Sequence, residues 1–314
     1  MCKISIIVAV YNTQDYLIEC LNSIKNQSFG DFEVLLINDG STDSSGNICN
    51  DFAFNDNRFK VFHQVNMGIS CVRNFGVLNA CGDYIIHVDS DDFVAPHFLE
   101  ALYNKIEDSQ ADVAFCDFVR FSESIRYEDT QKIKLNSEDI IIGILTGNHF
   151  GALWNKLIKR SILIENNIEI NEKISWLEDV FVIISVLINT KKVVYVNEAL
   201  YNYRFTPNSL SYTRNKKSFL SSFIVVEKIS KILPKKDLIQ NALIEFKLGI
   251  RRDILLFGRE HNFPRIYPET NNFIAKSKVL TSFQKIALKL EDENLYVLLN
   301  LLLKTRLILK KMKG

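Results

Sequence analysis

"YIIHVDSDDF", residues 84–93, joins a mostly apolar run to three carboxylates. The run 84–88 predicts a strand covered on both faces, because such strands lack the alternation of apolar and polar residues. Asp89, Asp91 and Asp92 then follow directly. Neighbouring negative charges repel one another and favour neither a strand nor a buried core. A bound cation would relieve that repulsion, so the stretch indicates a candidate ligand site at a strand end.

The first third of the chain repeats this order of strand, polar turn and helix. Mostly apolar runs at 4–10, 32–37 and 59–63 predict three further strands, and Thr13 is the predicted N-cap of a helix. Residues 68–80 predict another helix. Strands alternating with helices over short connections indicate an α/β fold with a mostly parallel sheet. Ligands bind outside the carboxyl ends of such strands, so we expect "YNT", "NDGSTD" and "DSDD" to converge at one edge.

The alternation weakens beyond the fourth predicted strand. Residues 111–121 predict a strand, and 152–167 and 176–190 predict helices. The runs "KVVYV" and "ALYNYRF" predict two separate strands. From about residue 215 onward the pattern is helical, so we expect a C-terminal helical region over 216–314.

The composition excludes several classes of protein. The chain has 314 residues, of which 47% are hydrophobic and 24% charged, and its formal net charge is +1. These values are typical of a globular protein and unlike those of a basic nucleic-acid binder. No apolar run reaches the roughly 18 residues that a membrane span needs, and no signal peptide is recognisable. We therefore expect a cytoplasmic protein with no nucleic-acid partner.

The cysteines favour the same compartment. None belongs to a C-x-x-C pair, so a zinc site is not expected. Each stands singly in an apolar stretch, which is typical of small core residues in a reduced protein. The six are Cys2, Cys20, Cys49, Cys71, Cys81 and Cys116.

Two interpretations are open for each polar cluster in the first third. One of the Asp89 and Asp91 carboxylates can ligate Mg²⁺ or Mn²⁺ while the other binds a ribose, or the stretch is a solvated turn. Asp39 can accept the N3–H of uracil, or it caps a turn. Arg73, which follows Gly68, can bind a diphosphate through its planar fork, or it lies on the surface near a helix start.

Two later clusters also allow two interpretations each. Glu178 and Asp179 precede an apolar helix, where a carboxylate can take a proton from a sugar hydroxyl as general base. The alternative is that both acids simply stabilise the amino end of the helix. Arg204, in the segment that also contains Ser209, can cover a leaving diphosphate, or it is an ordinary surface arginine.

Together these segments resemble the family-2 glycosyltransferases, which are inverting, nucleotide-sugar-dependent enzymes of GT-A fold. The resemblance covers about the first two-thirds of the chain, and seven motifs in order are far more specific than one. Ala9 stands where the family often has proline and Val72 where it often has alanine, and neither change removes a functional group. The motifs are "VAVYN" (8–12), "NDGSTD" (38–43), "NMGISCVRN" (66–74), "HVDSDD" (87–92), "WNKLIKR" (154–160), "LEDV" (177–180) and "YNYRFTPNS" (201–209).

The resemblance implies a GT-A catalytic domain over 1–215, with a nucleotide-sugar half at about 1–95 and an acceptor half at about 96–215. It implies Asp91 as the ligand of Mn²⁺ or Mg²⁺, and Asp179, supported by Glu178, as the catalytic base. Asp39 would read the uracil with Tyr11 nearby, Asp89 would lie on the ribose side, and Arg204 would contact the diphosphate. The implied donor-binding residues are Ala9, Tyr11, Asp39, Gly68, Arg73, Asp89, Ser90 and Arg204.

The activity implied is non-processive hexosyl transfer from a UDP-sugar to a saccharide acceptor, lipid-linked as in bacterial surface-polysaccharide assembly. A nucleotidyltransferase is a rival interpretation, but it would carry a glycine-rich loop where this chain has "YNTQDY". A non-catalytic sugar-nucleotide-binding subunit is a second rival, and the presence of Asp179 counts against it.

Residues 294–314 are apolar at first and then basic, with no acid after Glu293. Such a segment can rest on the anionic inner face of a membrane. It can equally be a packed helix with a solvated basic end. The sequence leaves both interpretations open.

Overall fold

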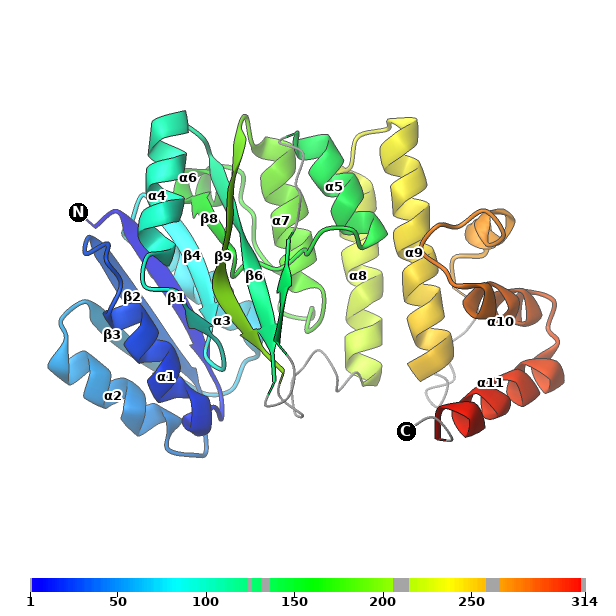
Figure 1. Cartoon of the computed structure of the whole chain (residues 1–314), viewed down its shortest axis with the longest axis horizontal. Helices are drawn as coiled ribbons and strands as arrows, with labels where there is room; N and C mark the ends of the chain where they lie inside the picture. The colour runs from blue at the N-terminus through cyan, green and yellow to red at the C-terminus, as the bar shows by residue number, and fades with distance from the viewer. Residues whose placement is uncertain (1, 123–125, 131–135, 206–214, 258–265, 312–314) are drawn as a thin grey trace.

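The computed structural model describes residues 2–122, 126–130, 136–205, 215–257 and 266–311, with side chains as far as residue 305. The described residues form one nine-stranded sheet in the order β3-β2-β1-β4-β8-β6-β9-β5, with β7 (Arg126–Asp129) paired to β6. Figure 1 shows the sheet covered by helices, with the last helices of the chain lying to one side. The expected α/β fold is therefore confirmed.

The amino-terminal half of the sheet is parallel, as predicted. All but one of the β1 side chains and every β2 side chain are buried, so both faces of these strands are covered. The register pairs Ala9 with Ile37 on one side and with Asp89 on the other, which places the carboxyl ends together. The four strands are β1 (Ile4–Val10), β2 (Phe32–Asp39), β3 (Phe59–Gln64) and β4 (Tyr84–Asp89).

The helix predicted over 152–167 is wrong in its middle. Residues Lys156–Lys159 form strand β8, and helix α6 covers only Arg160–Glu165. β8 lies between β4 and β6 (Val113–Phe121) and is antiparallel to both. The apolar pair Leu157 and Ile158 is compatible with a short buried strand as well as with a helix. The segment is a strand because it pairs with a neighbouring strand on each side.

The two strands predicted from "KVVYV" and "ALYNYRF" are one strand, β9 (Val193–Arg204). It runs parallel to β6, and the register shifts near Cys116 and Asp117, where extra β9 residues are accommodated. The polar residues between the two apolar runs are therefore an irregularity within a strand and not a turn. The end of β9 also pairs with β5 (Phe93–Val94).

The helices cover the two faces of the sheet in two groups. Alternate β1 side chains divide between the groups: Ile6 and Val8 pack in one cluster, and Ile7 packs in the other. The first face carries α1 (Gln14–Lys25), α2 (Ser45–Asn55) and α4 (Phe98–Ser109). The second carries α3 (Ile69–Asn79), α5 (Ser137–Thr146) and α7 (Glu178–Asn189).

The C-terminal helices extend the second face. Apolar residues of α8 (Lys216–Ile232) and α9 (Asp237–Phe257) belong to the same buried cluster as α5 and α7. A smaller cluster joins α9 to the segments beyond it, which are η2 (Pro268–Phe273), α10 (Ser282–Asp292) and α11 (Tyr296–Lys311). No helix among the described residues is both long enough and apolar enough to cross a membrane.

Two local predictions need correction. Thr13 precedes α1, but its side chain makes no capping hydrogen bond, because its hydroxyl donates to Ser90 Oγ (3.1 Å) instead. The cysteines are only partly core residues. Cys81 is exposed, and Cys2 and Cys71 are half-buried, whereas the other three are buried.

Gly76→Ala should destabilise the protein. A Cβ at this position of α3 would lie 2.6 Å from Ile7 Cγ2, and Ile7 is buried in β1 and has little room to move. Overpacking of this kind costs about 1–3 kcal/mol, which exceeds the helix propensity that alanine gains. We expect a net loss of at least about 1 kcal/mol in urea denaturation.

Gly249→Ala is the matched control, because Gly249 also lies inside a helix, α9. The nearest atom to its added Cβ is Arg252 Nη2 at 3.9 Å. With open space, alanine should stabilise by about 0.5–1 kcal/mol. Equal effects of the two substitutions would show that α3 is not packed tightly on β1.

Candidate active site

The polar segments after β1, β2 and β4 meet at the carboxyl edge of the sheet. The backbone N–H of Asn12 donates to Ser41 Oγ (3.0 Å), and Thr42 N donates to Asn12 Oδ1 (2.8 Å). The bond from Thr13 to Ser90 joins the first segment to the third. The expected convergence of these three segments is therefore observed.

Asp39, at the end of β2, organises the segment between β3 and α3. Its buried carboxylate accepts hydrogen bonds from Gln64 Nε2 (2.7 Å), Met67 N (2.8 Å) and Gly68 N (2.8 Å). Gly68 has a φ of +87°, a conformation that favours glycine. The position of Asp39 and the start of α3 are thus fixed by the same bonds.

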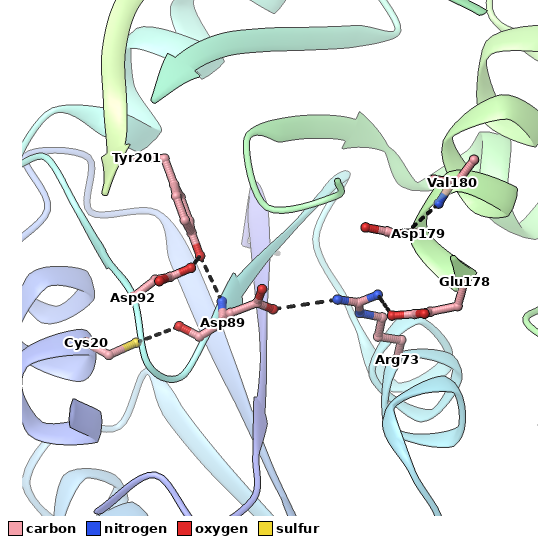
Figure 2. A network of polar contacts seen from close by, with 8 residues as sticks. All are labelled: Cys20, Arg73, Asp89, Asp92, Glu178, Asp179, Val180 and Tyr201. Atoms are coloured by element: carbon pink, nitrogen blue, oxygen red, sulfur yellow. Dashed lines mark hydrogen bonds and ion pairs between the residues drawn. The ribbon is translucent and has the colours of Figure 1, made fainter. Parts of the chain in front are cut away.

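Arg73 of α3 lies between two carboxylates that are far from it in sequence. Its Nη1 donates to Glu178 Oε1 (2.7 Å), and its Nη2 is 3.6 Å from Asp89 Oδ1 (Figure 2). The guanidinium is buried, and burial alone would lower its pKa, but the two carboxylates raise the pKa of Arg73 overall. Burial raises the pKa of Asp89, and the arginine opposes this effect. The group therefore links β4 to the start of α7.

Asp179 lies beside this ion network at the start of α7 (Figure 2). Burial and the adjacent Glu178 charge raise the pKa of Asp179 to about 7, and Arg73 opposes the rise. Among the described residues, the one hydrogen bond to its carboxylate comes from the neighbouring Val180 N (2.8 Å). Leu177, just before the pair, has a φ of +66°, which is strained for a residue with a branched side chain. A carboxylate that titrates near neutrality is suited to accepting a proton.

Arg204, at the end of β9, binds the aspartate-rich turn. Its Nε donates to the Asp91 carbonyl oxygen (2.8 Å), and its Nη2 pairs with Glu19 (2.5 Å). Its guanidinium also lies over the Phe121 ring at 4.7 Å. In this structure Arg204 therefore anchors the Asp91 segment. Ser209 lies outside the described residues.

Comparison with known proteins decides the family. A sequence model described as glycosyl transferase family 2 matches residues 5–166, which is just over half of the chain. The chain belongs to this family. The putative glycosyltransferase EpsH of Bacillus subtilis is 32% identical over 265 residues, covering 81% of this chain and 74% of EpsH. Glycosyltransferase GlyA of Streptococcus pneumoniae is 35% identical over 221 residues, covering 67% of this chain and 31% of GlyA.

Solved structures confirm the expected GT-A fold. Residues 1–349 of TarS from S. aureus superpose with a TM-score of 0.69 at 20% identity, covering 97% of this chain and 91% of that chain. The likeness extends over nearly the whole described chain, including the C-terminal helices. The protein is a glycosyltransferase, as its family and its named relatives show.

The aspartate-rich turn of this family-2 enzyme is held by residues that no local pattern of the sequence indicates. Asp92 is buried and accepts hydrogen bonds from the Tyr201 hydroxyl (2.8 Å) and from Arg204 N (2.7 Å). Asp89 N donates to the same hydroxyl (3.1 Å), and the Tyr201 ring stacks on Trp154 at 4.3 Å. Tyr201 and Trp154 stand in quoted motifs, but nothing local indicates that they are partners.

Lys156 is a further residue of this region that the sequence motifs did not single out. It is fully buried, and its ammonium donates to the Ala152 carbonyl oxygen (2.5 Å) and to Asn155 Oδ1 (2.5 Å). Burial lowers its pKa to about 7, and Asp179 opposes this effect. The available signal was a lysine directly before the apolar pair Leu157 and Ile158 in "WNKLIKR". Lys156 thus ties together the turn before β8.

The remaining predicted donor residues lie at the same edge with different exposure. Tyr11 is half exposed, Ala9 is partly buried, and Ser90 is buried. Asp91 is partly exposed beside Asp89. Carboxylate oxygens suit the hard cations Mn²⁺ and Mg²⁺, which also bind diphosphate oxygens, so the residues present fit the expected metal.

Asp179→Asn should become more stable than the wild type as the pH rises. In the folded protein Asp179 has a pKa of about 7, above its ordinary value of 3.8, so the folded state binds this proton more tightly. The contribution of that proton to stability is full at low pH and is lost between about pH 4 and 7. Urea denaturation at pH 4 and pH 8 should show the difference between variant and wild type growing by at least about 1 kcal/mol.

For Asp43→Asn, the stability of the variant relative to the wild type should change with pH in the opposite direction. Burial raises the pKa of Asp43, but hydrogen bonds from Ser45 and Gln14 outweigh burial and lower it overall. The Asp43 carboxylate therefore contributes to stability at pH values above its unfolded pKa. The asparagine variant should become less stable than the wild type as the pH rises. Parallel slopes for the two variants would contradict the environment described for Asp179.

Proposed function

We propose that this glycosyltransferase moves a sugar from a UDP-sugar to an acceptor hydroxyl with inversion, using Asp179 as general base. The observation that carries the proposal is the position of Asp179 at the start of α7, beside the Asp89–Arg73–Glu178 network (Figure 2). Two carboxylates share one arginine there, and the pKa of a third acid, Asp179, is raised to about 7.

The donor assignment draws on the carboxyl edge of the sheet and on the fold neighbours. TarS structures have been solved in complex with UDP and with UDP-GlcNAc. We infer a uridine diphosphate donor here, with Asp39 reading the uracil and Tyr11 beside the base. Ala9, Gly68, Ser90 and Asp89 would line the nucleoside, and Arg73 and Arg204 would supply positive charge near the diphosphate.

The reaction then follows from the groups at this edge. The acceptor hydroxyl gives its proton to Asp179 as its oxygen attacks the anomeric carbon from the face opposite the diphosphate. One displacement forms the new glycosidic bond, breaks the bond to the diphosphate and inverts the carbon. Mn²⁺ or Mg²⁺ held by Asp91 would stabilise the negative charge of the leaving diphosphate. Glu178 holds Arg73, so it positions charge and does not itself take the proton.

The acceptor proposed is a lipid-linked glycan of surface-polysaccharide assembly, met at the inner face of the membrane. Helix α11 supports this proposal, because Leu299 packs into the protein while Val297, Leu298 and Leu301 are more than half exposed. Basic residues follow in the sequence. An apolar face next to positive charge suits an anionic membrane surface. Vesicle flotation that is indifferent to anionic lipid would contradict this membrane contact.

Donor binding should require both the metal and Asp91. In calorimetry with Mn²⁺ present, UDP should bind better than GDP or ADP, and Asp91→Ala should weaken UDP binding at least about tenfold. Asp83→Ala, at an exposed aspartate outside the proposed site, is the control and should bind UDP normally. A preference for GDP would contradict the uridine assignment and favour a GDP-sugar donor. The mannosyltransferase PcManGT from Pyrobaculum calidifontis, which superposes on this chain with a TM-score of 0.56, was solved with GDP-Man and Mn²⁺.

Asp179→Asn should keep donor affinity and lose transfer. Asparagine retains the size of aspartate but cannot accept the proton, so kcat should fall at least about 100-fold. For the wild type, kcat/KM should decrease as the pH falls below about 7, because the base becomes protonated. The rate of UDP release at saturating donor measures transfer, and calorimetry of UDP binding measures donor affinity, so the two measurements separate a loss of catalysis from a loss of binding.

Asp139→Asn is the matched control for this experiment, since Asp139 also lies in the first turn of a helix, α5. It should leave transfer nearly unchanged. If Asp179→Asn behaves like Asp139→Asn, Asp179 only stabilises its helix. Binding without turnover in the wild type would instead revive the non-catalytic interpretation.

A further inference from the structure

Two cysteines and a glutamate meet at the amino edge of the sheet, opposite the candidate active site. Cys2 precedes β1, Glu33 is near the start of β2, and Cys81 lies between α3 and β4. The two sulfurs are 3.2 Å apart, and the two sulfurs and a Glu33 carboxylate oxygen all lie within 4.8 Å of one another. Among the described residues this is the one such group of three potential metal ligands.

Glu33 is held in place as an ionised carboxylate. Its Oε1 accepts hydrogen bonds from Ser5 Oγ (2.6 Å) and from Cys81 N (2.7 Å), and its Oε2 pairs with Lys60 (2.7 Å). These bonds outweigh burial and lower the pKa of Glu33 to about 2. The Glu33 side chain is buried whereas the Lys60 side chain is 51% exposed, so the lysine has room to shift beside the carboxylate when another cation arrives.

We propose that Cys2, Cys81 and Glu33 bind one thiophilic divalent cation of the zinc class. Zn²⁺ takes sulfur and carboxylate ligands together, and thiolates select it over the hard cations proposed for the carboxyl edge. Binding releases the two thiol protons, so the two thiolates and the carboxylate exceed the charge of the ion by one. Lys60, which pairs with Glu33 at this edge, is placed to balance the excess negative charge.

The two sulfurs need only a small movement to bind one ion. Sulfur ligands about 2.3 Å from a tetrahedral ion lie roughly 3.8 Å apart, so the two sulfurs must separate by roughly 0.6 Å. Cys81 is exposed and Cys2 is half-buried, which leaves room for this movement and for a water molecule as fourth ligand. The site lies about 20 Å from Asp39 along β2, so it would clasp three strand ends and take no part in transfer.

Cobalt is the probe for this site, because thiolate ligands give Co²⁺ intense charge-transfer absorption. The reduced, metal-free full chain should bind one equivalent with such bands, and Zn²⁺ should displace the cobalt. Cys2→Ser and Cys81→Ser should each weaken binding at least about tenfold, since even residues behind a metal ligand cost 10–100-fold. Zn²⁺ should also raise the Tm of the wild type and not that of Cys81→Ser.

Cys71→Ser is the control, because Cys71 is half-buried like Cys2 but outside the group. It should keep the thiolate bands and the zinc-dependent Tm. Cobalt binding without thiolate bands would place the ion elsewhere and overturn the proposal. Unchanged binding by folded Cys81→Ser would do the same. A third contrary result would be a purified protein that contains a Cys2–Cys81 disulfide and still binds no metal after the disulfide is reduced.

Discussion

The buried guanidinium of Arg73 is the interaction on which the candidate active site depends. It joins α3 to Glu178 at 2.7 Å and to Asp89 at 3.6 Å, and so holds three separate elements in one arrangement. Removing one partner from a buried ion network typically costs about 3–5 kcal/mol, because the charges that remain lose their compensation. The geometry of the carboxyl edge is therefore coupled to the stability of the fold.

The same network explains why neighbouring acids differ in character. Glu178 takes the short bond to Arg73, whereas Asp179 accepts, among the residues that the structure describes, one hydrogen bond, from Val180 N. Burial then raises the pKa of Asp179 to about 7. A carboxyl group whose pKa is raised by its surroundings is suited to a proton-transfer role. The strained backbone of Leu177 is consistent with a helix start whose position is set by the site.

A second set of contacts gives the aspartate-rich turn its shape. Asp92 is turned inward to Tyr201 and Arg204, which leaves Asp89 and Asp91 nearer the surface. Repulsion among the three carboxylates is thus relieved partly by hydrogen bonds to one of them and partly by Arg73. Strand β2 shows the same division at its two ends. Asp39 is bound by backbone and amide N–H groups, whereas Glu33 is bound by a lysine beside two thiols.

The sequence by itself determined the features that depend on neighbours along the chain. Apolar runs predicted the four parallel strands, and the polar segments after β1, β2 and β4 had to meet, because parallel strands share one carboxyl edge. The same motifs indicated the family. The tertiary structure alone decided what distant residues do together. β8 is a strand because β4 and β6 flank it, and Arg73 finds Glu178 at a separation of 105 residues. Tyr201 reaches Asp92, and Cys2 meets Cys81, only after the sheet has formed, because local periodicity carries no information about which side chains face each other across strands.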